Sequence, residues 1–269
     1  MFRYIKLYFS YIKQSIIGRL EFKADLFISI FAFFLASASS LGTIYLTISS
    51  VPSLIDSNGI SWTFWEIGLI YGFSLIPIGL DHLFTDELWR VAYFRVANGT
   101  VDRYFLRPLP ILFQVIAERF QFDAFGELIV GIFLIVICSL NASVCWNFQA
   151  IFLLIVASIF GAIIISSLKI IFSSLAFRFK KSGPLLQIVY NFRDYSRYPI
   201  NIFPKVLQFI LCFAFPFGLF SSLPFEAILK GTYNCYYLSS IIAGVSILFL
   251  SLSMLIWIIN IRKYESTGS

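Results

Sequence analysis

Long apolar stretches alternate with short charged loops along this chain, and their lengths predict its secondary structure. Each stretch has about 20 residues or more, the length that an α-helix needs to cross the hydrocarbon core of a bilayer. They cover residues 26–50, 64–84, 124–144, 149–177, 205–225 and 238–261. The pattern predicts an all-α integral membrane protein with six transmembrane helices over residues 26–261, forming a single transmembrane domain over residues 1–269.

The first 25 residues have a different pattern, because charged and apolar side chains alternate at helical spacing. Ile5, Phe9 and Ile12 recur on one helical stripe, with Lys6 beside it. Such a helix is too charged to span a bilayer, and its basic flank suits the cytoplasmic headgroup layer. We therefore predict an interfacial helix over residues 1–25, with a targeting peptide as the alternative.

Basic residues are unequally distributed among the loops, and this distribution orients the spans. The N-terminal segment, the 85–123 loop, the loop after the fourth span and the C-terminal end are rich in Lys and Arg, whereas the other loops hold only Lys230. Because an excess of Lys and Arg marks the cytoplasmic side, both termini and the two long loops are predicted to be cytoplasmic. The net charge of +6 lies beside the membrane, where lipid headgroups or a protein partner explain it better than nucleic acid does.

Composition and motifs argue against an enzyme. Hydrophobic residues make up 59% of the chain and charged residues only 13%, which leaves no large soluble domain. The sequence holds neither G-x-x-x-x-G-K-[ST] nor G-x-S-x-G nor H-E-x-x-H. Its four cysteines form no C-x-x-C pair, and His82 is its single histidine, so neither a metal nor a cofactor is expected in this chain. Cys145 and Cys235 both fall in loops assigned to the outer face and could form a disulfide.

A few polar residues interrupt the apolar runs. Lys169 lies roughly 12 Å below the basic end of the fourth span, at the rise of an α-helix, and snorkelling to the interface is the predicted behaviour. Asp81 and His82 are predicted to cap the inner end of the second span, with a proton relay as the alternative. Gly68 and Gly72 in the same span predict close helix packing, either within one subunit or between two.

The fifth apolar segment is expected to be broken. Pro216 interrupts it and Pro224 follows, and a proline in a helix removes a backbone hydrogen bond and bends the axis. Residues 215–231 are therefore expected to dip back into the membrane from the outer side.

One polar segment in the 85–123 loop is a candidate contact to a protein partner. Gly99 permits a positive φ and Pro108 forbids a continuing helix, so residues 100–107 are predicted to form at most two helical turns. Asp102 suits the amino end of such a helix, and Arg103 and Arg107 would share one of its sides. A solvated loop is the alternative. The candidate contact residues are Gly99, Asp102, Arg103, Tyr104, Leu106, Arg107 and Pro108.

These residues also resemble a known family. The runs Phe22-Lys-Ala-Asp25, Trp62-Thr-Phe-Trp-Glu66 and Arg197-Tyr-Pro199, and above all Gly99-x-x-Asp-x-x-x-Leu-Arg-Pro108, are similar to those of bacterial ABC type-2 permeases, in the branch related to drug and antibiotic-resistance exporters. The resemblance implies a six-span half of a dimeric permease in the bacterial plasma (inner) membrane. It also implies an N-terminal elbow helix, a cytosolic coupling helix in the 85–123 loop, and separate ABC ATPase subunits that bind ATP and Mg. The second permease subunit would be the same or a related chain, with membrane lipids around both.

Two other classes of function fit the residues alone. A membrane scaffold or assembly factor could bind a cytosolic partner through the same loop without moving a substrate. An intramembrane enzyme would need a nucleophile with a base or a metal at matching depth, and a single histidine argues against it.

Overall fold

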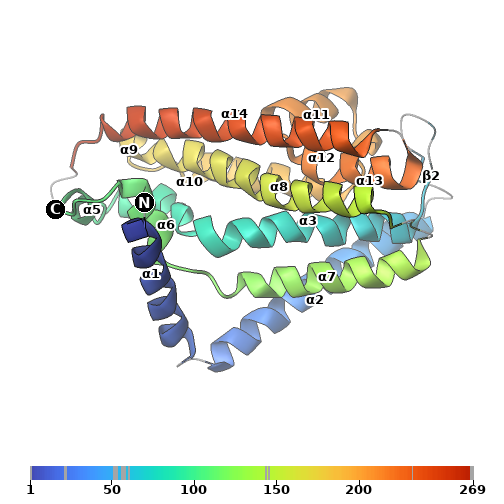
Figure 1. Cartoon of the computed structure of the whole chain (residues 1–269), viewed down its shortest axis with the longest axis horizontal. Helices are drawn as coiled ribbons and strands as arrows, with labels where there is room; N and C mark the ends of the chain where they lie inside the picture. The colour runs from blue at the N-terminus through green and yellow to red at the C-terminus, as the bar shows by residue number, and fades with distance from the viewer. Residues whose placement is uncertain are drawn as a thin grey trace.

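The computed structural model describes residues 2–20, 23–50, 54–55, 59, 61–142, 144, 146–231 and 233–266. Within these ranges the chain is almost entirely helical, with one short antiparallel strand pair. Figure 1 shows long helices lying side by side along the longest axis, with α5 and the C-terminus at one end and β2 and α13 at the other. We call these the α5 end and the β2 end.

Four helices are long and apolar enough to cross a membrane, judged by length and composition over the described residues. They correspond to the second, third, fourth and sixth predicted spans. They are α3 (Phe64–Thr85), α7 (Ala124–Asn141), α8 (Phe148–Ser174), which continues into α9 (Ala176–Phe179), and α14 (Cys235–Ile261). In this layer α3 packs against both α7 and α8, and α14 packs along the other side of α8.

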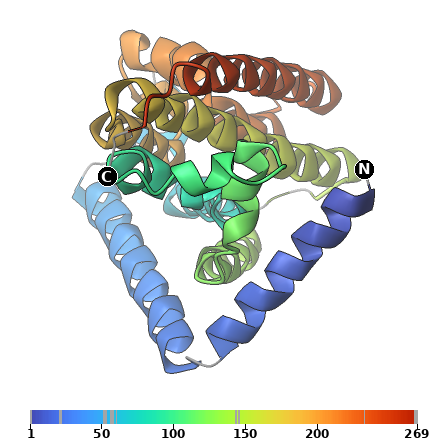
Figure 2. The same cartoon turned by 90° about the vertical axis from the view of Figure 1, so that its left-hand side faces the viewer.

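The first predicted span and the interfacial helix correspond to two helices that diverge from this layer. These are α2 (Lys23–Ser50), whose described apolar stretch is Phe31–Leu46, and α1 (Phe2–Leu20). Figure 2 shows both inclined away from the other helices, with α7 between them. The structure thus confirms helices at both places, while the elbow role of α1 and the spanning role of α2 stay predictions.

The fifth predicted span is broken, as the prolines indicated. It consists of α11 (Lys205–Phe209), η4 (Ile210–Ala214), α12 (Phe217–Phe220) and α13 (Ser222–Lys230). The chain leaves helical geometry at Phe215, with φ −124° and ψ 80°, just before Pro216. Phe217, Phe220 and Phe225 are fully buried, so α12 and α13 are anchored in the core as short helices. A return into the membrane by residues 215–231 stays a prediction.

The remaining elements are short and connect the long helices. At the α5 end, between α3 and α7, lie α4 (Glu87–Arg90), η1 (Val91–Arg95), α5 (Asp102–Phe105) and α6 (Ile111–Glu118). Between α9 and α11 lie α10 (Gly183–Asp194), η2 (Tyr195–Arg197) and η3 (Ile200–Ile202). A hairpin of β1 (Leu54–Ile55) and β2 (Ser61–Trp62), with Leu54 opposite Trp62, was not predicted.

Glycines bring α3 and α7 into direct backbone contact. A Cβ atom added to Gly72 would lie 2.7 Å from Leu134 Cβ, and one added to Gly131 would lie 2.8 Å from the carbonyl oxygen of Gly72. Gly68 faces Cys138 of the same helix α7 in the same way. Of the two alternatives that the sequence left open, the structure shows packing within one chain.

The β2 end is closed by an ion pair across the layer. Thr63 and Glu66 form a capping box at the start of α3, and Lys230 Nζ at the end of α13 lies 2.5 Å from Glu66 Oε1. Lys230 also lies over the ring of Trp62, 5.2 Å from its centroid. Cys145 lies outside the described residues, so its possible disulfide with Cys235 stays a prediction.

Candidate functional site

The coupling segment, as we call residues 99–108, begins with a sharp turn of the chain. Gly99 has φ +67°, a left-handed conformation that glycine adopts without strain, as the sequence predicted. The backbone N–H of Val101 then returns to donate to the carbonyl of Arg95 at 3.3 Å. The turn places the single helical turn α5 beside η1 and α6.

The helix in this segment is within the predicted limit of two turns. It covers Asp102–Phe105, a single turn, and Arg107 lies beyond its end. Pro108 ends the helix, because it has no N–H to donate to the carbonyl of Tyr104 four residues earlier. The Gln114 amide of α6 donates instead, to the carbonyls of Tyr104 and Leu109, both at 2.9 Å, and satisfies these two acceptors.

A network of charges fixes the inner side of the coupling segment. The guanidinium of Arg95 donates to Glu87, to the hydroxyl of Tyr104 and, at 2.6 Å, to Glu118. Arg103 also pairs with Glu118. Arg103 and Arg107 therefore do not act together on one side of a helix, which corrects the prediction. The sequence carried no signal for Glu118 as the shared partner.

Apolar packing completes the inner side. Val101 and Tyr104 are buried, at 0% and 1% exposure, in a cluster that joins the loop to α8 and α14. The outer side is open, because the predicted contact residues Leu106, Arg107 and Pro108 are all exposed, Leu106 at 86%. The structure thus separates the predicted residues into an anchored group and an exposed group. Within the described residues Arg107 makes no ion pair.

Asp102 lies at the amino end of α5, as predicted, and its carboxylate accepts two hydrogen bonds from the segment after α14. The hydroxyls of Tyr264 and Ser266, from the segment after α14, donate to its two oxygens at 2.7 Å each. These bonds, from Ser266 first and then Tyr264, lower the pKa of Asp102. Burial and the bond to Asp102 raise the pKa of Tyr264 to about 12.

A second polar cluster lies inside the layer of spans, near the α5 end of α3 and α8. Lys169 Nζ lies 2.6 Å from Asp81 Oδ2, and both side chains have 0% exposure. The hydroxyls of Thr85 and Ser166 donate to the other oxygen of Asp81, at 2.5 and 2.7 Å. Tyr190 lies beside Lys169, with its ring centroid 5.7 Å from Nζ.

Snorkelling of Lys169 is therefore wrong, and so is a capping role for Asp81. Because α3 and α8 pack directly, the carboxylate of Asp81 reaches the ammonium group at the same depth, and pairing satisfies both charges without moving either to the interface. The sequence held one signal for this pair. Asp81 and Lys169 are each four or five residues from the ends of α3 and α8 at Thr85 and Ser174.

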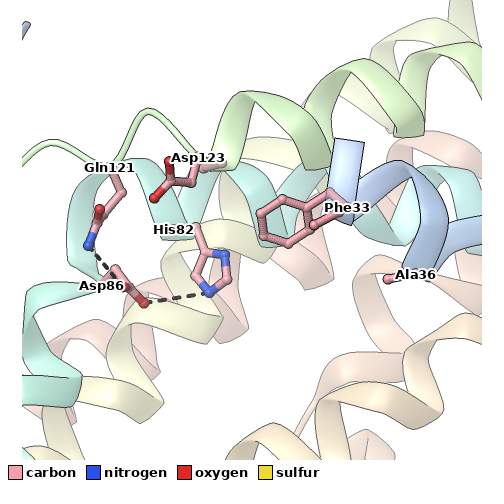
Figure 3. A pocket seen from close by; sticks show the side chains of 8 residues that line it. Phe33, Ala36, His82, Asp86, Gln121 and Asp123 are labelled. Atoms are coloured by element: carbon pink, nitrogen blue, oxygen red, sulfur yellow. Dashed lines mark hydrogen bonds and ion pairs between the residues drawn. The ribbon is translucent and has the colours of Figure 1, made fainter. Parts of the chain in front are cut away.

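His82 likewise bonds across helices rather than capping α3. Its Nδ1 lies 2.9 Å from Glu127 Oε2 on α7, and its Nε2 lies 3.5 Å from Asp86 Oδ1. Figure 3 shows His82 and Asp86 facing a cavity of about 460 Å³, with Gln121 and Asp123 on one side and Phe33 of α2 on another. Among the described residues no group of three or more His, Cys, Asp or Glu side chains could hold a metal ion.

Comparison with protein families identifies the chain. A model described as ABC-2 family transporter protein matches residues 34–268, which include most of α2, the four long apolar helices and the coupling segment. The chain belongs to the ABC-2 family. It is a multi-pass membrane component of ABC transport, and the family acts as a permease rather than as a catalytic subunit. A comparison with curated proteins gives no match. The ABC-2 match gives the coupling segment its context, since ABC transport couples a membrane component to ATPase partners.

Proposed function

We propose that this chain is the permease half of an ATP-driven exporter and that its coupling segment docks a separate ATPase subunit that binds ATP and Mg. The supporting observation is the two-sided construction of the segment. Its inner side is fixed by Arg95, Glu118 and Gln114, while Leu106 and Arg107 face outward. A surface that must transmit force needs both features, an exposed contact and a rigid support.

The support reaches the spans directly. Arg95 ends η1, which continues from α4 and α3 with hardly a break, and Glu118 ends α6, which leads into α7. A push on the coupling segment from the cytosol would therefore act on α3 and α7, the pair with the closest backbone approach. We infer that these two helices are the first to respond to the ATPase.

A second permease subunit, the same or a related chain, is part of the proposal. Apolar side chains are exposed on α2 and on the α11–η4 helix, including Phe31 at 61%, Leu35 at 53%, Phe209 at 62% and Phe213 at 66%. Membrane lipids or the second subunit would cover them. We place the complex in the bacterial inner membrane, with both termini cytoplasmic, as the loop charges indicate.

Photocrosslinking tests the docking surface. A photoreactive amino acid at position 106 should crosslink the chain to its copurifying ATPase subunit in membranes. The same group at position 237, whose tyrosine is also exposed (66%) but lies at the start of α14, should not. No crosslink from position 106, with the ATPase present in the purified complex, would contradict docking at this segment.

A membrane scaffold, the alternative function, would differ from a permease in its effect on the ATPase rate of the partner. A permease should raise the ATPase rate of its partner when substrate is present, because hydrolysis is coupled to movement through the spans. A scaffold binds the same partner and leaves its rate unchanged. Hydrolysis measured in proteoliposomes, with and without a transported compound, separates the two.

A further inference from the structure

The segment that follows α14 closes over one side of the coupling segment. We call residues 262–266 the strap. Besides the two hydroxyl bonds to Asp102, the ring of Tyr264 stacks on Phe105, with centroids 5.3 Å apart and planes inclined by 12°. Figure 1 shows the chain leaving α14 at the end of the molecule where α5 lies.

The two ends of the strap are held to the rest of the chain with different strength. Tyr264 is held from behind by Phe177, whose ring meets it edge-on at 5.7 Å, so the ring is part of the core cluster. Ser266 is exposed, and its bond to Asp102 competes with water. The Phe105 side chain keeps 46% of its surface exposed even under the stacked ring. The outer part of the strap can therefore leave while the base of Tyr264 stays.

The chemistry of Asp102 favours another occupant. Its carboxylate receives two neutral hydroxyl donors, which leave its negative charge uncompensated, whereas a Lys or Arg side chain would bring the opposite charge and an Arg could bind both oxygens at once. The flat ring of Phe105 next to it could also stack with a guanidinium group. Asp102 and Phe105 adjoin the exposed Leu106 and Arg107, so a partner seated on those residues reaches the carboxylate.

We propose that the strap covers Asp102 and Phe105 in the isolated chain, and that a basic side chain of the docking ATPase displaces the Ser266 and Tyr264 hydroxyls to reach the carboxylate. The strap thereby lowers the affinity of the coupling segment for its partner. This inference rests on the proposed function, since it assumes that an ATPase docks there. It adds a competition between the C-terminal end of the chain and the partner for one carboxylate.

The expected effect follows from population arithmetic. If the docking-competent state is the one with the strap displaced, the apparent dissociation constant is the intrinsic one divided by the fraction of open molecules. Each hydroxyl bond to the carboxylate that is removed should raise the affinity about tenfold, the lower end of typical net contributions for hydrogen bonds to charged groups, because Asp102 is only partly buried.

The experiment measures binding of the copurifying ATPase subunit to the full chain in nanodiscs. Tyr264→Phe keeps the stacked ring and removes one donor, and Ser266→Ala removes the other. Tyr237→Phe and Ser251→Ala are matched controls, because Tyr237 is exposed at the start of α14 and Ser251 bonds only within α14. The proposal predicts tighter binding for the double variant Tyr264→Phe/Ser266→Ala and no change for the controls. In that double variant, Asp102→Asn should weaken binding, because the partner's cation loses its carboxylate.

Two results would overturn the proposal while leaving docking intact. Unchanged or weaker binding in the double variant, with Arg107→Ala still weakening it, would show that the strap supports the segment instead of competing. Full affinity after Asp102→Asn in the Tyr264→Phe/Ser266→Ala background would show that no partner cation reaches this carboxylate. If Arg107→Ala also leaves ATPase binding unchanged, the proposed function itself is contradicted.

Hydrogen exchange gives a test that needs no partner. In the isolated chain, exchange of residues 101–106 should be faster in the double variant than in the parent. Unchanged exchange would show that the two hydroxyls do not hold residues 262–266 against the coupling segment.

Discussion

Lys169 and Asp81 form an ion pair at 2.6 Å in which neither side chain is exposed. The pair joins α8 to α3 near the α5 end of the layer, and Thr85 and Ser166 complete the bonding of Asp81. Two charges buried together can be tolerated, whereas one charge left alone cannot, since it loses hydration without compensation.

Breaking this pair from one side should destabilise the protein strongly. Lys169→Met leaves Asp81 buried without its cation and should lower the free energy of unfolding by about 3 to 5 kcal/mol. The double variant Lys169→Met/Asp81→Asn should recover most of this loss, because no uncompensated charge remains. Thermal unfolding in detergent of both variants and of the parent measures the coupling.

The control for this prediction is Lys205→Met, which removes an exposed lysine and should change stability little. If Lys169→Met behaves like Lys205→Met, the ammonium group reaches the interface after all and the buried pair is not formed.

The close approach of α3 and α7 gives a second prediction. Gly72→Ala would place its Cβ 2.7 Å from Leu134 Cβ, so the helices must separate, at a cost of about 1 to 3 kcal/mol. Gly244→Ala in α14 has open space around it and should be neutral or slightly stabilising, as expected for glycine to alanine in a helix. Equal melting temperatures for the two variants would contradict the packing.

The orientation of the chain can be tested by thiol labelling in a cysteine-free background. Cysteine at position 106 or 263 should react with an impermeant reagent only from the cytoplasm, and cysteine at position 237 only from outside. Labelling of position 237 from the cytoplasm would reverse the topology.

The contact between Asp102 and Tyr264 should not change with pH in the physiological range. The lowered pKa of Asp102 means that its contribution is present above the ordinary value of 3.8 and is lost as pH falls through the lowered value. The raised pKa of Tyr264 means that its contribution is present below 10.0 and is lost as pH rises through about 12. Hydrogen exchange of residues 102–105, corrected for intrinsic rates, should therefore be constant between about pH 5 and pH 9. A step within that window would assign the protection to another group.

Hydropathy and turn chemistry were sufficient for much of the fold. The helices α3, α7, α8 and α14 lie where apolar length predicted spans, and Pro216 breaks the fifth segment where expected. The positive φ of Gly99 also followed from local rules. These features depend on residues close together in the sequence, so they could be predicted from a single amino-acid sequence.

The features that the sequence did not predict depend on distant partners. Lys169 pairs with a residue 88 positions earlier, Glu118 of α6 is shared by Arg95 and Arg103, and Asp102 is occupied by the C-terminal strap. Periodicity and propensity carry no information on which helix lies beside which. The short β1–β2 hairpin was missed for another reason, since two-residue strands have no periodic pattern.

Arg107 lies on the exposed side of the coupling segment, where we propose that an ATPase subunit docks, and its truncation is the sharpest test of that docking. Truncating an arginine that meets a carboxylate in a partly buried interface costs about 2 to 5 kcal/mol. Thr100→Ala, which removes only a hydroxyl bond to the Arg95 carbonyl, is the control within the same turn. We would measure the ATPase copurified with each variant and the substrate-stimulated hydrolysis of each complex. Arg107→Ala should insert normally and lose the partner or its coupling, while Thr100→Ala matches the parent; an Arg107→Ala chain that keeps its partner and couples fully would contradict the account.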